Sequence, residues 1–159
     1  MKRNVETSVT ILPVTNLKKK IYIYDDGGRA TTGYKGTTGD CAVRSIAIVT
    51  DKSYQQVYDA LNHLTKFEHI TKRKRKISNS RTGVYRRTIH KYLLSLGMSW
   101  TPTMFIGSGC KVHLKESELP SGRLVVCVSR HYVAVIDGVI HDTYDCSRDG
   151  TRCVYGYYK

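Results

Sequence analysis

The sequence has half as many acidic as basic residues, and this shortage restricts its partners. It contains 13 Asp and Glu against 26 Lys and Arg, which gives a net charge of +13 at pH 7. A positive balance of this size favours polyanions such as nucleic acid or another acidic surface. Part of the excess lies in one run, namely Lys72, Arg73, Lys74, Arg75 and Lys76. This run fits either a solvated loop or a phosphate-contacting surface, and we expect it to dock an acidic partner.

Long apolar runs are also missing. No segment approaches the ~18 apolar residues that a membrane span needs, and the first residues lack the apolar centre of a secretory signal. We therefore expect no membrane partner and a cytoplasmic location. There is no phosphate-binding glycine loop, internal repeat or domain linker. With 159 residues and 40% apolar content, we expect one domain, spanning residues 1–159, with a genuine core.

The five cysteines, an odd number, include no CxxC pair and no Cys/His metal spacing. We accordingly expect neither a metal nor another cofactor. Cys127 lies in an apolar, strand-like run and is typical of a core residue. Cys146 and Cys153 flank a turn and could meet, but free thiols in a reducing cytoplasm are the simpler interpretation.

Cys41 stands at the predicted start of a helix. Asp40 is a favoured N-cap type, and residues 41–50 are mostly small or apolar, as in a buried helix. A thiolate in the first turn is favoured by the helix dipole and by a nearby imidazolium, whereas the Asp40 carboxylate opposes it. A single cysteine on an apolar helix also fits a small buried hydrophobe.

A predicted hairpin supplies a histidine and an aspartate. The Asp-Gly pair at 137–138 is a two-residue turn signal between apolar runs. Such a turn pairs Val133 with Asp142 and His131 with Tyr144, so these four side chains share one face. Asp142 then becomes the diagonal neighbour of His131, and the hairpin selects it over the other two nearby aspartates. A histidine on an apolar strand also fits a core position, but its joint occurrence with Cys41 and Asp142 favours a nucleophilic site.

These features resemble the papain-like cysteine peptidase superfamily, and particularly the small bacteriocin-leader peptidases. The shared features are Asp40-Cys41 opening an apolar helix, a late strand beginning at His131, and Asp142 on the next strand. Residues 39–159 are also similar to a group of uncharacterised bacterial and bacteriophage proteins. That similarity lies in the runs Arg130-His131, Ile140-His141-Asp142-Thr143, Ser147-Arg148-Asp149-Gly150 and Tyr155-Gly156-Tyr157.

The resemblance implies a thiol hydrolase or acyl transferase, phage- or mobile-element-encoded, acting on a peptide, isopeptide or side-chain amide. It assigns Cys41 as nucleophile, His131 as general base and acid, and Asp142 as the group that orients the imidazole. The family places a glutamine shortly before the cysteine as an oxyanion donor, but residues 34–39 contain neither Gln nor Asn. The backbone N–H of Cys41 remains, and the candidates for a second donor are Lys35, Thr37 and Thr38. Loss of one donor typically lowers the rate by about 10²–10³.

The resemblance and the element pattern together predict an α+β, papain-like fold, with N-terminal helices packed on a C-terminal antiparallel sheet. We expect a strand/loop segment at 1–38, helices at 41–50, after Ser53, and at 84–96, and a mobile basic insertion at 66–82. Ser53 and Gln56 form a capping-box signature. A short apolar piece lies at 9–12, and strands are expected at 21–24, 104–106, 124–129, 131–137, 139–144 and, as an edge, 154–158. The rival interpretation is a non-catalytic basic protein that binds nucleic acid or a host protein on a degenerate papain-like fold.

Overall fold

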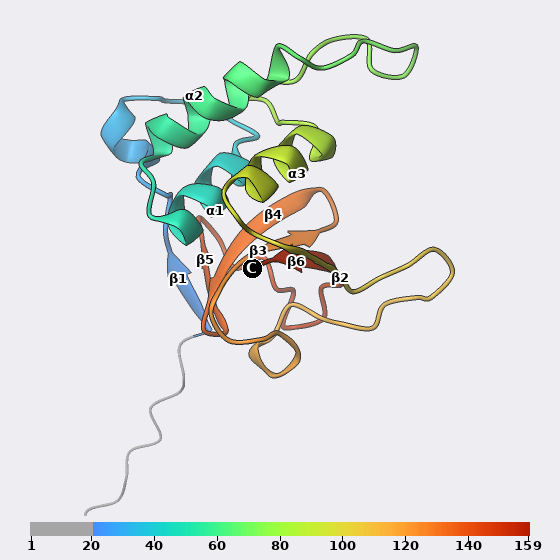
Figure 1. Ribbon diagram of the computed structural model, residues 1–159. Helices are drawn as coiled ribbons and strands as arrows, with labels where there is room; N and C mark the ends of the chain where they lie inside the picture. Colours follow the sequence, from blue (N-terminus) through green and yellow to red (C-terminus); the bar gives the residue numbers. More distant parts are fainter. Residues whose placement is uncertain (1–20) are drawn as a thin grey trace, which may run out of the picture.

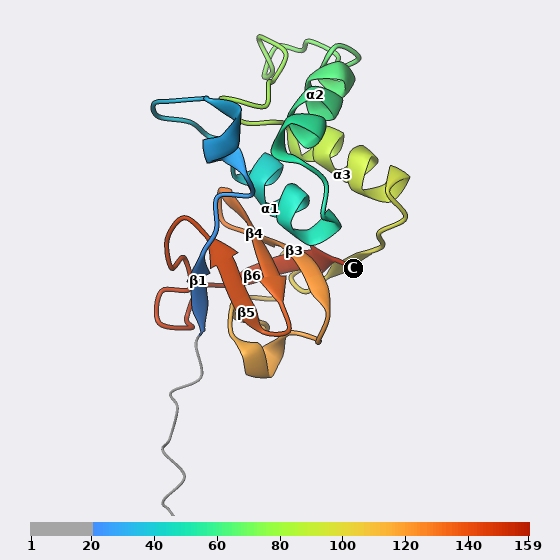
Figure 2. The ribbon, with the colours of Figure 1, turned by 90° about the vertical axis from the view of Figure 1, so that its left-hand side faces the viewer.

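The computed structural model describes residues 21–159, in which three helices pack on a six-stranded, mostly antiparallel sheet (Figures 1 and 2). The helices are α1 (Cys41–Thr50), α2 (Tyr54–Thr65) and α3 (Arg86–Ser95). The strands are β1 (Tyr22–Tyr24), β2 (Trp100–Pro102), β3 (Arg123–Val128), β4 (His131–Ile136), β5 (Val139–Asp142) and β6 (Val154–Tyr158). Their order across the sheet is β1-β5-β4-β3-β6-β2. The predicted α+β class is confirmed, whereas the apolar piece at 9–12 lies outside the described residues.

The first two helices begin and end where local chemistry dictates. α1 has the predicted bounds and ends at Asp51, whose φ of 55° is left-handed. The predicted capping box opens α2: the Ser53 hydroxyl accepts from the Gln56 N–H, and the Gln56 side chain accepts from the Ser53 N–H. Asp40 occupies the N-cap position of α1, as predicted, but its side chain makes no capping hydrogen bond. Arg44 and Tyr54 hold that carboxylate instead.

The β4–β5 hairpin has the predicted register. Asp137 and Gly138 both have positive φ, 47° and 81°, as expected for a tight turn of the type that matches strand twist. Ile136 pairs with Val139, and the next pairs away from the turn are Val135 with Ile140 and Ala134 with His141. A slip of one residue would have moved every side chain of β5 to the opposite face. The register therefore fixes which aspartate can approach His131.

Two apolar clusters cover the two faces of the sheet. Val125, Ala134 and Tyr158 pack with the three helices on one face. Alternate residues of the same strands, among them Val126 and Val133, pack on the other face beneath loop residues. The sheet is therefore buried on both sides, and its central strands read as apolar runs for that reason.

Non-local strand pairing departs from the sequence prediction in three places. β6 lies between β3 and β2 and is not an edge strand. The outer strand is β2, whereas residues 104–106, predicted as a strand, are exposed loop. A Cβ at Gly156 would collide with the Trp100 ring, so glycine allows the β2–β6 approach. β1 is a strand as predicted, but it pairs in parallel with β5.

The cysteines also require a correction. Cys110 and Cys153 form a disulfide with a Cα–Cα distance of 5.8 Å, so the expectation of five free thiols is wrong for this pair. Cys153 lies near Cys146 in sequence, but its partner is contributed by a distant loop. Cys127 and Cys146 are buried free thiols. Separately, no helix within residues 21–159 is long and apolar enough to span a membrane.

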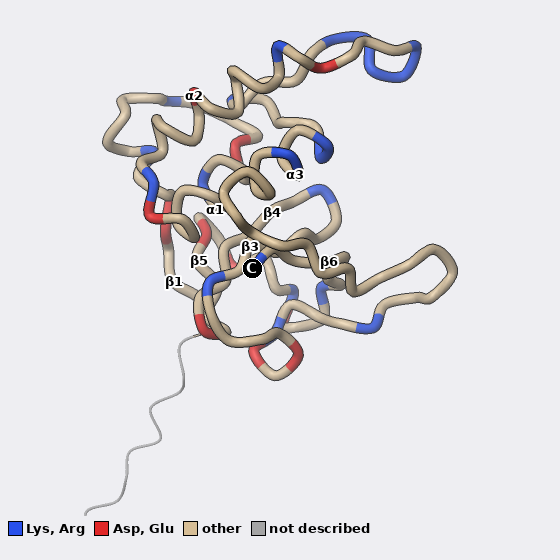
Figure 3. The backbone as a smooth tube through the Cα atoms, in the orientation of Figure 1, with Lys and Arg blue, Asp and Glu red and all other residues tan. Residues whose placement is uncertain are grey.

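The basic segment 66–82 projects from the helical layer (Figures 1 and 3). Four of the five residues in the basic run are exposed, and Lys74 is half-buried over the Tyr85 ring. Glu68 anchors the base of the segment by accepting from the Ser78 N–H, the Ser78 hydroxyl and the Thr88 hydroxyl. The prediction that this segment is mobile stays a prediction.

Candidate active site

A cleft of about 850 Å³ lies between the helical layer and the ends of the central strands, and both Cys41 and His131 line it. One wall comes from the loop 36–39 and from residues 82–84. The other comes from the β3–β4 turn and from the chain that follows β5. Asp142 is behind this surface, buried at 3% exposure. The structure thus brings the predicted nucleophile and base to one solvent-accessible space.

Cys41 is the first residue of α1 and is half-buried. Burial raises the pKa of its thiol, but the hydrogen bond and charge of His131, with help from Arg44, lower that pKa below its ordinary value. The preceding loop is pinned in place, since the Gly39 N–H donates to the Arg81 carbonyl at 2.7 Å. A Cβ on Gly39 would lie 2.7 Å from the Thr82 carbonyl oxygen, so only glycine fits this approach to the cysteine.

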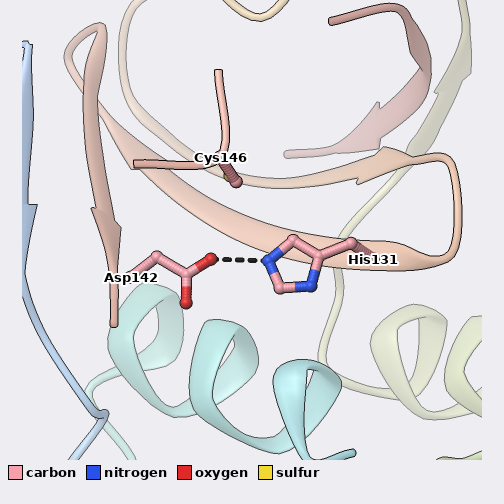
Figure 4. A group of neighbouring side chains, drawn as sticks. All are labelled: His131, Asp142 and Cys146. Atoms are coloured by element: carbon pink, nitrogen blue, oxygen red, sulfur yellow. Dashed lines mark hydrogen bonds and ion pairs between the residues drawn. The ribbon is translucent and has the colours of Figure 1, made fainter. Parts of the chain in front are cut away.

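His131 and Asp142 meet at one end of the hairpin, where β4 begins and β5 ends. His131 Nε2 lies 2.5 Å from Asp142 Oδ2, which confirms the predicted contact (Figure 4). Burial lowers the pKa of His131, but hydrogen bonds to Asp142, Cys146 and Cys41 raise it well above its ordinary value. Because Nε2 is engaged by the carboxylate, Nδ1 is the ring nitrogen left for the thiol. The resting form that this electrostatic setting favours is a thiolate beside an imidazolium.

A buried arginine ties these groups together, and sequence reasoning missed it. Arg44 donates through Nη1 to Asp40 Oδ1 and through Nη2 to Asp142 Oδ1, the latter at 3.1 Å. Asp40 also accepts from the Tyr54 hydroxyl at 2.6 Å and lies 3.5 Å from Arg29 Nε. Asp40 is therefore neutralised by two arginines, which removes its expected opposition to the thiolate. Helical spacing could have indicated the Asp40–Arg44 pair, because i,i+4 residues are neighbours on a helix.

Cys146 is the second group that the sequence did not place here. The ligand atoms of His131, Asp142 and Cys146 all lie within 4.8 Å of one another, and all three residues are buried (Figure 4). Such a set has the residue types of a transition-metal site. A metal bound to Nε2 would displace the hydrogen bond between His131 and Asp142. The expectation that the protein binds no metal stays a prediction.

The three oxyanion candidates occupy different positions. Thr37 and Thr38 line the cleft, whereas Lys35 is exposed and is not among the lining residues. The Thr38 hydroxyl donates to the Arg81 carbonyl at 2.7 Å, so its proton is already used. Of the three candidates, Thr37 lines the cleft and has no hydrogen bond from its hydroxyl to another group within residues 21–159. Their role in oxyanion binding stays a prediction.

Comparison with known proteins identifies no relative: no family model, curated protein or solved structure matches this chain.

Proposed function

We propose that the protein is a papain-like cysteine hydrolase or acyl transferase that acts on a peptide, isopeptide or side-chain amide. The observation that carries this proposal is the chain of contacts from Cys41 through His131 to Asp142 at the edge of one cleft. Each member has the residue type and the neighbour that its role requires. The proposal also includes a phage or mobile-element origin, a cytoplasmic location and a place among the thiol proteases.

The geometry supports a two-step reaction. The Cys41 thiolate attacks the carbonyl carbon, a C–S bond forms, and negative charge develops on the carbonyl oxygen. The His131 imidazolium then gives its proton to the leaving nitrogen as the C–N bond breaks, which leaves a thioester. His131 next accepts a proton from water, the hydroxyl adds to the thioester carbonyl, and cleavage of the C–S bond releases a carboxylic acid and restores the thiolate–imidazolium pair. An amine in place of water would make the same enzyme a transferase.

The rest of the site supports this sequence of proton movements. Asp142 holds the imidazole by Nε2 and stabilises its charged form, which the first step requires. Burial raises the pKa of the Asp142 carboxyl, but His131 above all, with help from the Thr143 N–H and Arg44, lowers that pKa below its ordinary value. The Cys41 N–H and the 36–38 loop are the proposed oxyanion donors.

Selective alkylation tests the proposal. Iodoacetamide at pH 6 should modify Cys41 in the native protein, as mapped by mass spectrometry, because His131 lowers the pKa of its thiol. Cys127 and Cys146 are internal controls, since both are buried. Trapping an acyl group on Cys41 from cell extract would then identify the substrate. An unreactive Cys41 at pH 6 would contradict the proposal.

A second candidate function follows from the basic run. Four of its five cations are exposed, and no ion pair joins any of the five to a carboxylate within residues 21–159. The rival proposal is a non-catalytic nucleic-acid- or host-protein-binding protein. Inertness of Cys41 combined with salt-sensitive binding to a polyanion would favour it.

A further inference from the structure

Apart from the Cys41 thiolate, the charged side chains that line the cleft are all basic. The lining includes four arginines, at positions 29, 44, 86 and 130, and no aspartate or glutamate. Two of these arginines already have buried carboxylate partners. Arg44 binds Asp40 and Asp142, and Arg29 lies 3.5 Å from Asp40. The uncompensated charge of the cleft is therefore carried by Arg86 and Arg130.

These two arginines are exposed, and they line the cleft from separate elements. Arg86 is the first residue of α3, and its guanidinium lies 5.1 Å from the centre of the Trp100 ring. Arg130 lies in the β3–β4 turn, directly before His131. Its φ of 56° is left-handed, a conformation that costs energy for an arginine and that recurs at functional sites. In the described part of the chain, neither guanidinium has a carboxylate partner.

A guanidinium presents paired N–H donors that match the two oxygens of a carboxylate. The contact of the Arg86 guanidinium with the Trp100 indole restricts the motion of this arginine. We propose that Arg86 and Arg130 form a carboxylate-binding subsite beside Cys41. The substrate is then a polypeptide with an Asp or Glu side chain close to the scissile amide. This inference rests on the proposed reactivity of Cys41 and adds the substrate class to it.

The test compares two alkylating reagents on the full chain. Iodoacetate and iodoacetamide form the same C–S bond with Cys41 and release iodide, but only iodoacetate carries a carboxylate. The measured quantity is the ratio of their second-order rate constants at pH 7 and low salt. R86Q and R130N should each lower this ratio about threefold, and the double variant about tenfold, as for single exposed charge pairs. Added salt should lower the wild-type ratio as well.

R148N is the matched control. Arg148 is also exposed and also left-handed, with φ of 53°, but it does not line the cleft. Asparagine tolerates this conformation at both positions. R148N should leave the ratio unchanged. Because His131 itself favours an anionic reagent, the change in ratio between variants is the evidence, and the wild-type ratio alone is not.

Protection experiments identify the anion. N-acetylglutamate should slow the alkylation of wild-type Cys41 by iodoacetamide more than N-acetylglutamine does, and R86Q/R130N should abolish that difference. Protection by inorganic phosphate but not by N-acetylglutamate would overturn the carboxylate assignment. If Cys41 reacts but the ratio of the two rate constants is the same in wild type, R86Q and R130N, the subsite is overturned and the proposed function is not. A Cys41 inert to both reagents would overturn the proposed function, and the subsite with it.

Discussion

Arg44 Nη2 lies 3.1 Å from Asp142 Oδ1, across 98 residues of sequence. This contact joins the helix that begins at Cys41 to the carboxylate that orients His131. The guanidinium also binds Asp40, so a single cation holds two buried carboxylates. The relative position of the thiol and the imidazole therefore depends on Arg44, which takes no part in the proposed bond-making steps.

Arg44→Met should destabilise the fold by up to about 3–5 kcal/mol, because two buried carboxylates lose a shared counter-charge and keep only Arg29 and His131 as cationic partners. Urea denaturation measures this loss. Adding Asp40→Asn should recover part of the lost stability, since the buried carboxylate of residue 40 is then replaced by a neutral amide. Equal stabilities of the single and double variants would show that the Arg44–Asp40 contact carries no such energy.

His131→Ala should shift the alkylation profile of Cys41 to higher pH. His131 lowers the pKa of the thiol despite the opposing effect of burial, so its removal raises that pKa. At pH 6 the rate with iodoacetamide should fall, because less of the thiol is ionised there, and the profiles should converge at alkaline pH. His141→Ala is the control, because His141 contacts Asp25 and does not line the cleft. Superimposable profiles for wild type and His131→Ala would contradict the ion pair.

The Cys110–Cys153 disulfide should be detectable and stabilising. Non-reducing peptide mapping should recover these two cysteines in one linked peptide, with three free thiols elsewhere. The bond closes a loop over a sequence separation of 43, for which chain entropy gives about 4 kcal/mol as an upper expectation. Cys110→Ser/Cys153→Ser should therefore lower the denaturation midpoint. Five free thiols in the oxidised, purified protein would contradict the pairing.

Neutralising Arg73, Lys74 and Arg75 to glutamine should weaken binding to a polyanion. If these residues contact phosphates of duplex DNA, the salt dependence of log K should lose up to about 0.9 per contact. Binding to a fluorescent duplex at several salt concentrations measures both effects. Cys41 alkylation provides a second readout: its loss in the triple variant would place the segment in the active site. Identical salt slopes would show that the run is only a solvated loop.

The parts that sequence predicted well depend on neighbours along the chain. The bounds of α1, the capping box at Ser53 and the turn at 137–138 all follow from local chemistry, and the turn sets the register that delivers Asp142 to His131. The helix predicted at 84–96 is shorter, spanning Arg86–Ser95.

The missed parts depend on contacts between distant segments. The interior position of β6, the parallel pairing of β1 and the partner of Cys153 are set by packing across the sheet. Arg44 was overlooked because a charged residue within an apolar helix finds its second carboxylate only in three dimensions. Local patterns carry no information about such partners.

The order of the site residues along the chain has a consequence for biosynthesis. Cys41 leaves the ribosome well before His131 and Asp142, which lie on β4 and β5. Until those two residues have been made, no imidazole lies beside Cys41 to lower the pKa of its thiol. Under the proposed function, a nascent chain therefore carries a cysteine that becomes a nucleophile only once the β4–β5 hairpin is in place.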